Sequence, residues 1–193
     1  MKILSWIRLV VIFILFTSFS GPESKKYQVE IVQDGQLIPI VDNIALLEKK
    51  EFQIKITLYN HEGVFMSSSF NRDYFDLRDD QEIKDYRWLN LKSIAEEEYN
   101  KDKELVVDDE LVSFLFYDKK MDWHRFDENI VIDRNIVIAT KTINKVLVHS
   151  SNQEITINQI DNNIYLFFVA TEEWNGDVAP KELGRKKIEL RWK

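Results

Sequence analysis

Hydrophobic and polar residues alternate with a period of two along several short stretches of the chain. The clearest stretch is 51–59, in which every second residue from Phe52 to Leu58 is apolar and the residues between them are polar. In a β-strand such alternation places the apolar side chains on one face and the polar ones on the other, so we expect a strand with one buried and one solvated face. Similar stretches predict strands at 27–31, 36–41, 64–70, 130–132, 136–139, 146–149, 154–158, 164–170 and 187–192.

Turn residues indicate how neighbouring strands connect. Asp34 and Gly35 favour positive φ values, so they predict a tight hairpin between the first two strands. Pro39 has no amide hydrogen, which predicts that the second strand lies at a sheet edge or is bulged there. The polar residues 60–63, NHEG, predict a second hairpin between the next two strands.

The period of two is lost between residues 71 and 103, where acidic residues are frequent. Ser93 and Glu96 have the spacing of a capping box, in which each side chain bonds a backbone amide at the start of a helix. We therefore expect a short helix at 94–100 within a long insertion. Residues 111–117, LVSFLFY, then resume strand character with apolar residues on both faces, which is typical of a strand covered on both sides.

The number and spacing of these elements predict the fold class. Nine or ten short strands with tight polar turns and one helical insertion favour an all-β, antiparallel β-sandwich of the immunoglobulin-like or jelly-roll-like kind. A closed β-barrel is the alternative that the same pattern allows. No Pro-, Gly- or Ser-rich linker interrupts the chain, so residues 22–193 are expected to form a single domain.

The first 21 residues have the layout of a secretory signal peptide. Lys2 and Arg8 precede an apolar run at 9–16, and small residues such as Ser20 follow it. The run is shorter than the roughly 20 residues that a membrane-spanning helix needs. We expect residues 1–21 to be cleaved, which leaves no stable membrane span, and the protein to be exported to the periplasm or the extracellular space. Retention of the segment as an anchor is the alternative.

The charge and cysteine content of the chain exclude several classes of partner and site. The chain has 33 Asp and Glu against 26 Lys and Arg, a formal net charge of −7, and this surface would repel phosphate backbones, so no nucleic-acid partner is expected. Residues 73–110 are strongly acidic, whereas 181–193 are basic. No cysteine is present, which excludes disulfide bonds and thiolate metal sites.

Sequence motifs for catalysis are absent. The chain has no Gly-x-Ser-x-Gly elbow, no His-Glu-x-x-His sequence and no glycine-rich phosphate loop. We therefore expect no cofactor, and a non-enzymatic function is favoured over an enzymatic one.

The residues that could bind a metal follow no known spacing. The three histidines, His61, His124 and His149, are far apart in the sequence. The oxygen-rich turns at 108–110 and 161–163 contain the ligand type that calcium prefers, without the spacing of a calcium loop. We predict no metal site, and zinc or calcium binding remains an alternative that would require the fold to bring these residues together.

The densest polar-aromatic cluster follows the predicted strand at 111–117, in the sequence DKKMDWHRFD. Aromatic side chains and arginine dominate binding hot spots, and loops carried by a rigid sheet are where binding residues concentrate. A second aromatic cluster lies in the long insertion. The candidate binding residues are Asp122, Trp123, His124 and Arg125 in the first cluster and Tyr86 and Trp88 in the second. The alternative interpretation is that these aromatic residues close one end of the sandwich and bind nothing.

These observations favour an exported, non-catalytic binding domain whose partner is a protein or a component of the cell envelope, such as a glycan. One alternative is a hydrolase of envelope polysaccharide or peptidoglycan, which would use two of the carboxylates between residues 73 and 110. A further alternative is a structural module of an envelope assembly. No sequence feature identifies the partner or the oligomeric state.

Overall fold

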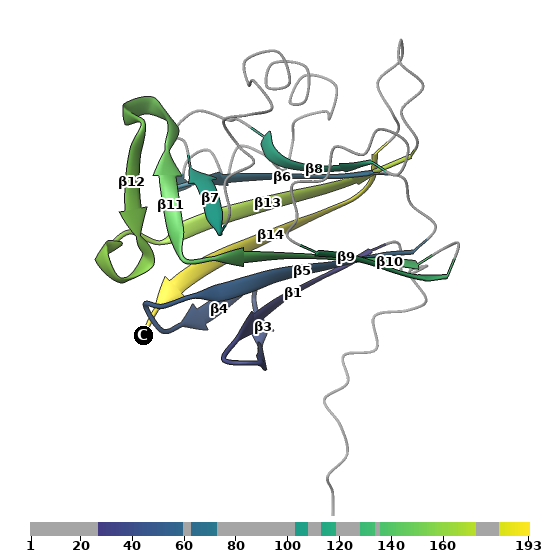
Figure 1. The fold of residues 1–193 in the computed structure, drawn as a ribbon, viewed down its shortest axis with the longest axis horizontal. Coiled ribbons are helices and arrows are strands. Elements are labelled where there is room, and N and C mark those ends of the chain that lie inside the picture. The colour runs from purple at the N-terminus through teal and green to yellow at the C-terminus, as the bar shows by residue number, and fades with distance from the viewer. Residues whose placement is uncertain are drawn as a thin grey trace, which may run out of the picture.

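The computed structural model describes residues 27–59, 63–72, 103–107, 113–118, 128–133, 136–172 and 182–193. These residues form β-strands almost throughout. Two large sheets stack face to face, and a third, small sheet stands across one end of them (Figure 1). The predicted all-β sandwich is therefore confirmed.

The first large sheet, sheet A, has the strand order β2–β1–β5–β10–β9 and is antiparallel throughout. Its strands are β2 (Gln36–Ile38), β1 (Tyr27–Gln33), β5 (Phe52–Tyr59), β10 (Ile136–Ile143) and β9 (Glu128–Asp133). The central strand β5 is the stretch with the clearest alternation in the sequence. Ile54 of β5 pairs with Ile31 on one side and with Lys141 on the other.

The second large sheet, sheet B, has the order β3–β4–β14–β13–β6–β8. Its strands are β3 (Ile40–Val41), β4 (Ile44–Leu47), β14 (Glu182–Trp192), β13 (Ile164–Thr171), β6 (Gly63–Ser69) and β8 (Ser113–Asp118). β4 runs parallel to β14, and the other neighbours are antiparallel. Among the described residues both large sheets end in edge strands, so they form a sandwich and not a closed barrel.

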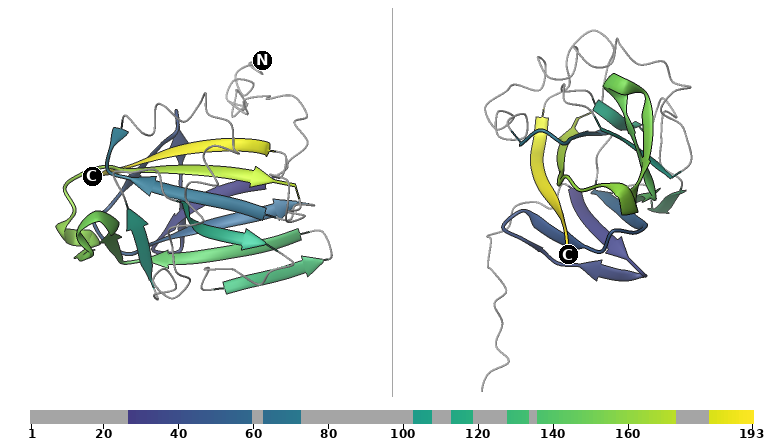
Figure 2. Two further views of the ribbon diagram at one scale, coloured as in Figure 1. Left: turned by 90° about the horizontal axis from the view of Figure 1, so that it is seen from above. Right: turned by 90° about the vertical axis from the view of Figure 1, so that its left-hand side faces the viewer.

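The small sheet, sheet C, has the order β12–β11–β7, in which β7 and β11 are parallel. Its strands are β7 (Glu104–Val107), β11 (Lys145–Val148) and β12 (Gln153–Thr156), and the 3-10 helices η2 (His149–Ser151) and η3 (Ile157–Gln159) flank β12. Seen from above, sheet C lies at one end of the long strands (Figure 2). Ser68 of β6 donates a hydrogen bond from its hydroxyl to the Val106 carbonyl, which fastens sheet C to sheet B.

The hydrophobic core fills the space between the two large sheets and continues to sheet C. In β10 every second residue is buried, as the pleat of a strand with one face on the core requires. Fully buried apolar side chains come from all three sheets, and they include Ile31, Phe52, Ile54, Ile56, Leu58, Ala139 and Ile143 of sheet A, Leu47, Met66, Leu166, Phe168, Ile188 and Leu190 of sheet B, and Leu105, Val107 and Val146 of sheet C.

The predicted strand at 36–41 is in fact two strands in different sheets, β2 in sheet A and β3 in sheet B. In the β3–β4 hairpin Ile40 pairs with Ala45, so the next pair would be Pro39 with Leu46. In a hairpin with a two-residue turn this pair would exchange backbone hydrogen bonds, and Pro39 has no amide hydrogen to donate. The pairing of β3 with β4 therefore ends before it reaches Pro39. The prediction that Pro39 stands at a sheet edge is confirmed, because β2 and β3 are both edge strands.

The predicted hairpin between 51–59 and 64–70 is wrong. β5 belongs to sheet A and β6 to sheet B, so the chain crosses between the layers after Tyr59 instead of folding back within one sheet. The physical reason is that both strands have a strongly apolar face, and the two faces cover the same core from opposite sides. A polar tetrapeptide in the sequence does not distinguish such a crossing from a hairpin.

Two strands were not predicted. β4 and β7 each have four residues, too few for a period to be recognised, and each pairs in parallel with a strand far along the chain. The backbone of β8 confirms the strand predicted at 111–117, with its bounds shifted to Ser113–Asp118. The helix expected at 94–100 lies outside the described residues.

Candidate functional site

Three exposed apolar residues lie where the chain passes from sheet A to sheet B. Among the described residues the large hydrophobic side chains that are exposed are Leu37, Val41 and Leu46, at 59%, 64% and 50%. Leu37 lies on the outward face of β2, and Val41 and Leu46 lie on the outward side of the β3–β4 hairpin. We call these three residues, together with the groove described next, the β2–β4 corner.

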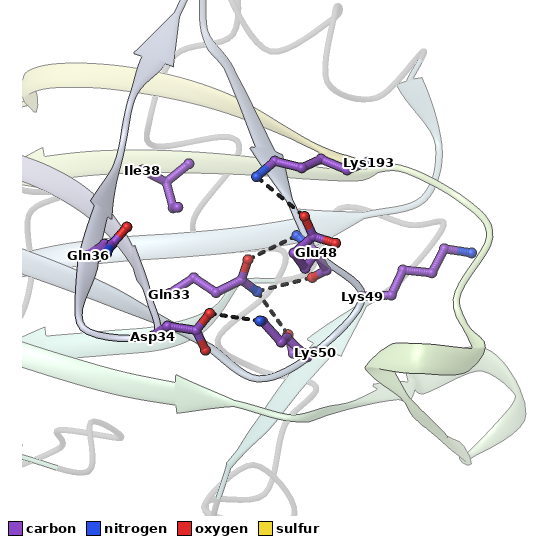
Figure 3. Close-up of a pocket in the computed structure, with 8 residues that line it drawn as sticks. All are labelled: Gln33, Asp34, Gln36, Ile38, Glu48, Lys49, Lys50 and Lys193. Carbon is purple, nitrogen blue, oxygen red and sulfur yellow. Dashed lines mark hydrogen bonds and ion pairs between the residues drawn. The ribbon is translucent and has the colours of Figure 1, made fainter.

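A shallow groove of about 580 Å³ lies between strand β2 and the loop that follows β4 (Figure 3). It is lined by residues of the β1–β2 hairpin, of the loop between β4 and β5, and of the end of β14: Gln33, Asp34, Gln36, Ile38, Glu48, Lys49, Lys50 and Lys193. The groove is therefore built by segments that the fold brings together from 33–38, 48–50 and 193. Its walls are mainly charged and polar, with Ile38 as the apolar exception.

The Gln33 side chain forms the inner wall of the groove and holds the β4–β5 loop in place. Its amide nitrogen lies 3.0 Å from the Glu48 carbonyl and 3.3 Å from the carbonyls of Lys50 and Glu51, and its amide oxygen accepts a hydrogen bond from the Glu48 amide at 2.9 Å. Gln33 is 4% exposed. Because a buried amide must satisfy both its donors and its acceptor, this side chain has a structural role and cannot also bind a ligand without breaking these bonds.

The three lysines of the groove each face a carboxylate. Lys50 lies 2.7 Å from Asp34 and Lys193 lies 3.5 Å from Glu48, and both pairs are on the rim (Figure 3). The hydrogen bond to Asp34 raises the pKa of Lys50. Lys49 pairs instead with Asp161 at 2.6 Å, and this hydrogen bond lowers the pKa of Asp161. These pairs are exposed, so they contribute little to stability and their side chains can exchange partners.

A second cluster of charged side chains lies on the outward face of sheet B. The β14 charged row consists of Arg185, Lys187, Glu189 and Arg191, which alternate with the core residues Ile188 and Leu190. On β13 the side chains opposite Lys187 and Glu189 are Phe167 and Tyr165. Lys187 is only 9% exposed, although it points away from the sandwich core.

Glu189 is the centre of a hydrogen-bond network in this row. Arg191 donates from Nε to Oε1 at 2.8 Å and from Nη2 to Oε2 at 2.9 Å, and Asn163 donates to Oε1 at 2.8 Å. The hydrogen bonds from Arg191 are the largest cause that lowers the pKa of Glu189, and the charge of Arg72 contributes further. The same pair raises the pKa of Arg191. The network joins the end of β14 to the loop before β13.

The binding residues predicted from the sequence, Asp122, Trp123, His124, Arg125, Tyr86 and Trp88, lie outside the described residues. The structure shows where the first cluster is attached. Residues 119–127 connect β8 to β9, which are edge strands of different sheets. The connection therefore starts on one layer of the sandwich and ends on the other.

Sequence reasoning missed the β2–β4 corner, because its exposed residues cannot be told from core residues by type. Leu46 is half exposed and the next residue, Leu47, is fully buried. The only local signal was Pro39, which marked the edge. The groove has no signal of its own in the sequence, since Lys193 reaches it from the far end of the chain.

The described residues contain no group of three or more His, Asp or Glu side chains that could hold a metal ion. His149 begins η2, and the other two histidines lie outside the described residues. In the turn proposed for calcium, Asp161 pairs with Lys49 and the Asn162 carbonyl accepts a hydrogen bond from the Trp192 indole at 2.8 Å. These oxygens bind groups of the protein itself. The acidic turn at 108–110 is not part of the described chain.

No family model, no curated protein and no solved structure matches this chain. In the part of the chain that the structure describes, no helix has the length and apolar character needed to cross a membrane.

Proposed function

We propose that the protein is an exported binding protein that acts without catalysis and recognises another protein through the β2–β4 corner. The observation that carries the proposal is that Leu37, Val41 and Leu46, the exposed large hydrophobic residues of the described chain, all lie on the consecutive edge strands β2, β3 and β4. Scattered apolar residues on a surface need no explanation, but a group of them often marks an interaction site.

The groove between β2 and the loop after β4 supports the same interpretation. Protein interfaces combine an apolar centre with a polar rim, and here the rim carries Lys50 paired with Asp34 and Lys193 paired with Glu48. Exposed pairs of this kind can turn toward a partner at low cost, because water screens the attraction within each pair. Rim charges of this type set the orientation and rate of association.

The contribution of the corner can be tested by replacing its apolar side chains with polar ones. In an affinity capture from cell-envelope extract, we expect wild-type protein to retain a partner that the Val41→Ser/Leu46→Ser double variant loses. The matched control is Gln28→Ser/Gln153→Ser, which changes two exposed polar residues elsewhere and should retain the partner. Thermal unfolding of both variants checks that the fold is intact. The partner is then purified, and its Kd for the three proteins is measured.

Three outcomes would contradict the assignment. Equal capture by the wild type and the Val41→Ser/Leu46→Ser variant, with loss in a Trp123→Ala/His124→Ala/Arg125→Ala variant, would move the site to the connection between β8 and β9. Sedimentation of the wild type as a dimer that the corner variant abolishes would make the corner a contact between copies. Turnover of envelope polysaccharide by the wild type would replace binding with hydrolysis.

Export is tested separately. We expect the mature protein, isolated from cells that express the full chain, to begin close to residue 21 when its N-terminal sequence is determined. This follows from the basic, apolar and small-residue zones of 1–21. A mature protein that begins at Met1 and remains with the membrane fraction would show that the segment is retained as an anchor.

A further inference from the structure

The groove of the β2–β4 corner continues into a second hollow of about 320 Å³ at the β1–β2 turn. The second hollow is lined by Val32, Asp34, Gly35, Lys50, Glu51, Phe52 and Gln53. Asp34 and Lys50, which pair at 2.7 Å, line both hollows, so the hollows meet at this ion pair. We call the two hollows together the long groove.

The backbone on both sides of the Asp34–Lys50 pair is fixed. Asp34 at φ 52 and Gly35 at φ 74 form the tight hairpin turn on one side. On the other side the buried Gln33 amide donates to the carbonyls of Glu48 and Lys50 in the β4–β5 loop. The charged ends are less constrained, since the side chains of Asp34 and Lys50 are 65% and 49% exposed. The long groove therefore has preformed walls, which reduces the entropy lost on binding, and an ion pair across its middle that can open.

The charge of the lining side chains changes sign along the long groove. The first hollow is lined by three lysines and two acidic residues, Lys49, Lys50, Lys193, Asp34 and Glu48. In the second hollow the single lysine, Lys50, lies with two acidic residues, Asp34 and Glu51. Lysine side chains are therefore in excess at one end of the long groove, and carboxylates are in excess at the other.

The side chains that create this excess are Lys49 and Glu51, and each is held by an exposed partner outside the long groove. Lys49 lies 2.6 Å from Asp161, and Glu51 lies 3.3 Å from Lys103. Because water screens exposed ion pairs, these pairs exchange partners easily. A ligand that brings the opposite charge to each hollow can therefore recruit both side chains.

We propose that the long groove holds an extended segment of the protein partner, with an acidic side chain in the first hollow and a basic one in the second. An extended peptide presents charges of both signs at a regular spacing along one line. A small anion would match the first hollow alone, and a nucleic-acid backbone would be repelled by the second. The order of charges sets the direction in which the segment lies.

This inference rests on the binding function proposed for the β2–β4 corner, and it names the part of the partner that binds there. The long groove is continuous with the corner, because Gln36 and Ile38, the neighbours of Leu37 on β2, line the first hollow.

The test removes the charge difference between the hollows without changing the net charge of the protein. The variant is Lys49→Met/Glu51→Gln, which removes one charge of each sign. The matched control is Lys145→Met/Glu154→Gln, which does the same to an exposed pair at 3.2 Å on sheet C. Both changes concern exposed ion pairs, so both should leave the Tm close to that of the wild type.

Two kinds of probe are titrated against the full chain. One is the partner purified by affinity capture. The other is a pair of synthetic peptides of equal length and composition: a block peptide with glutamates in one half and lysines in the other, and an alternating peptide. Calorimetry gives the Kd, and NMR shifts of the Gly35 and Lys50 amides show whether the peptide lies in the long groove.

We expect the block peptide to bind the wild type and to shift both amides, with a Kd about fivefold lower than that of the alternating peptide. The Lys49→Met/Glu51→Gln variant should lose this preference, and its Kd for the partner should rise about tenfold. The Lys145→Met/Glu154→Gln control should behave as the wild type with both probes.

Two results would overturn the inference: equal affinity of the wild type for the two peptides, or an unchanged Kd of the Lys49→Met/Glu51→Gln variant for the partner. If the partner is still lost by Val41→Ser/Leu46→Ser, the corner remains the binding site and only the long groove is excluded. If the capture yields no partner, the function proposed for the corner fails by itself, and the two peptides decide whether the long groove binds an extended segment.

Discussion

Glu189 and Arg191 lie two residues apart on β14, and their charged groups join side by side on the outward face of sheet B through two hydrogen bonds of 2.8 and 2.9 Å. The Glu189 side chain is 8% exposed, and that of Arg191 is 40% exposed. Asn163 binds the same carboxylate, so the pair also anchors the loop that leads into β13. The arrangement gives Glu189 a larger part in stability than a surface carboxylate would have.

We predict that Glu189→Gln destabilises the protein by about 1–2 kcal/mol at pH 7, because hydrogen bonds to a charged group are lost or weakened. The folded-state pKa of Glu189 is lowered, so its stabilising effect is complete above the unfolded pKa of about 4.3 and is lost as the pH falls through the lower folded value. The wild type and the variant should therefore converge in stability as the pH falls below about 4. Urea unfolding across this range measures the difference.

The control for this prediction is Glu154→Gln. Glu154 is exposed and pairs with Lys145 at 3.2 Å, so removing its charge should change stability by less than about 1 kcal/mol. A pH dependence of stability that is the same in both variants would show that the Glu189 network contributes no more to stability than an exposed ion pair does.

Gln33→Ala should destabilise the fold by about 1–3 kcal/mol, because it leaves the Glu48 amide and the carbonyls of the β4–β5 loop without their buried partner. Denaturant unfolding at pH 7 measures the loss. Gln33→Glu should also be destabilising, since its carboxylate would face the carbonyl oxygens that the amide nitrogen now binds. Gln36→Ala, at an exposed neighbouring position of the same hairpin, should change stability by less than about 0.5 kcal/mol.

Gly35 has φ +74 in the β1–β2 turn, and a Cβ atom there would meet nothing within 4 Å. The cost of Gly35→Ala should therefore come from the backbone alone and amount to about 1–2 kcal/mol. Gly35→Asn should cost less, because Asn tolerates this conformation. Thermal unfolding of both variants tests the order, and a larger loss in Gly35→Asn than in Gly35→Ala would indicate that side-chain size and not φ decides the cost.

Local features of the sequence were enough to predict most of the strands and the first turn. Alternation from Phe52 to Leu58 follows directly from the pleat of a strand with one buried face, and Asp34 at φ 52 with Gly35 at φ 74 confirms the predicted tight turn. Pro39 indicated a sheet edge, because a residue without an amide hydrogen cannot donate a hydrogen bond to a neighbouring strand in any sheet.

Features that depend on distant residues were not predictable. β4 pairs in parallel with β14, about 145 residues later, and nothing in the sequence IALL of β4 identifies β14 as its partner strand. Leu46 and Leu47 are identical in type, and only the position of the core decides which of them is exposed. The groove could not be predicted for the same reason. Lys49, one of its residues, pairs with Asp161, which lies 112 positions later in the sequence. A sequence pattern shows which residues share one face of a strand. Whether that face is buried depends on the element that packs against it.

Lys186 provides a last test of how burial and charge compete. It is half-buried between the sheets, where its Nζ lies 3.5 Å from the Val29 carbonyl. Burial lowers the pKa of Lys186, and the nearby charge of Glu30 offsets this only in part. The folded state therefore disfavours the charged form, so Lys186→Met should leave stability at pH 7 unchanged or raise it, by up to about 1 kcal/mol. Glu30 retains Lys55 at 3.1 Å as its partner.

The pH dependence of the same variant checks the cause. Between the lowered folded pKa and the usual value of about 10.4, the unfolded wild type binds more protons at Lys186 than the folded protein does, so its stability should rise with pH relative to Lys186→Met. Urea unfolding from pH 7 to pH 10 would show the advantage of the variant shrinking. A loss of stability in Lys186→Met at pH 7 would instead mean that the contacts of the ammonium group outweigh its desolvation.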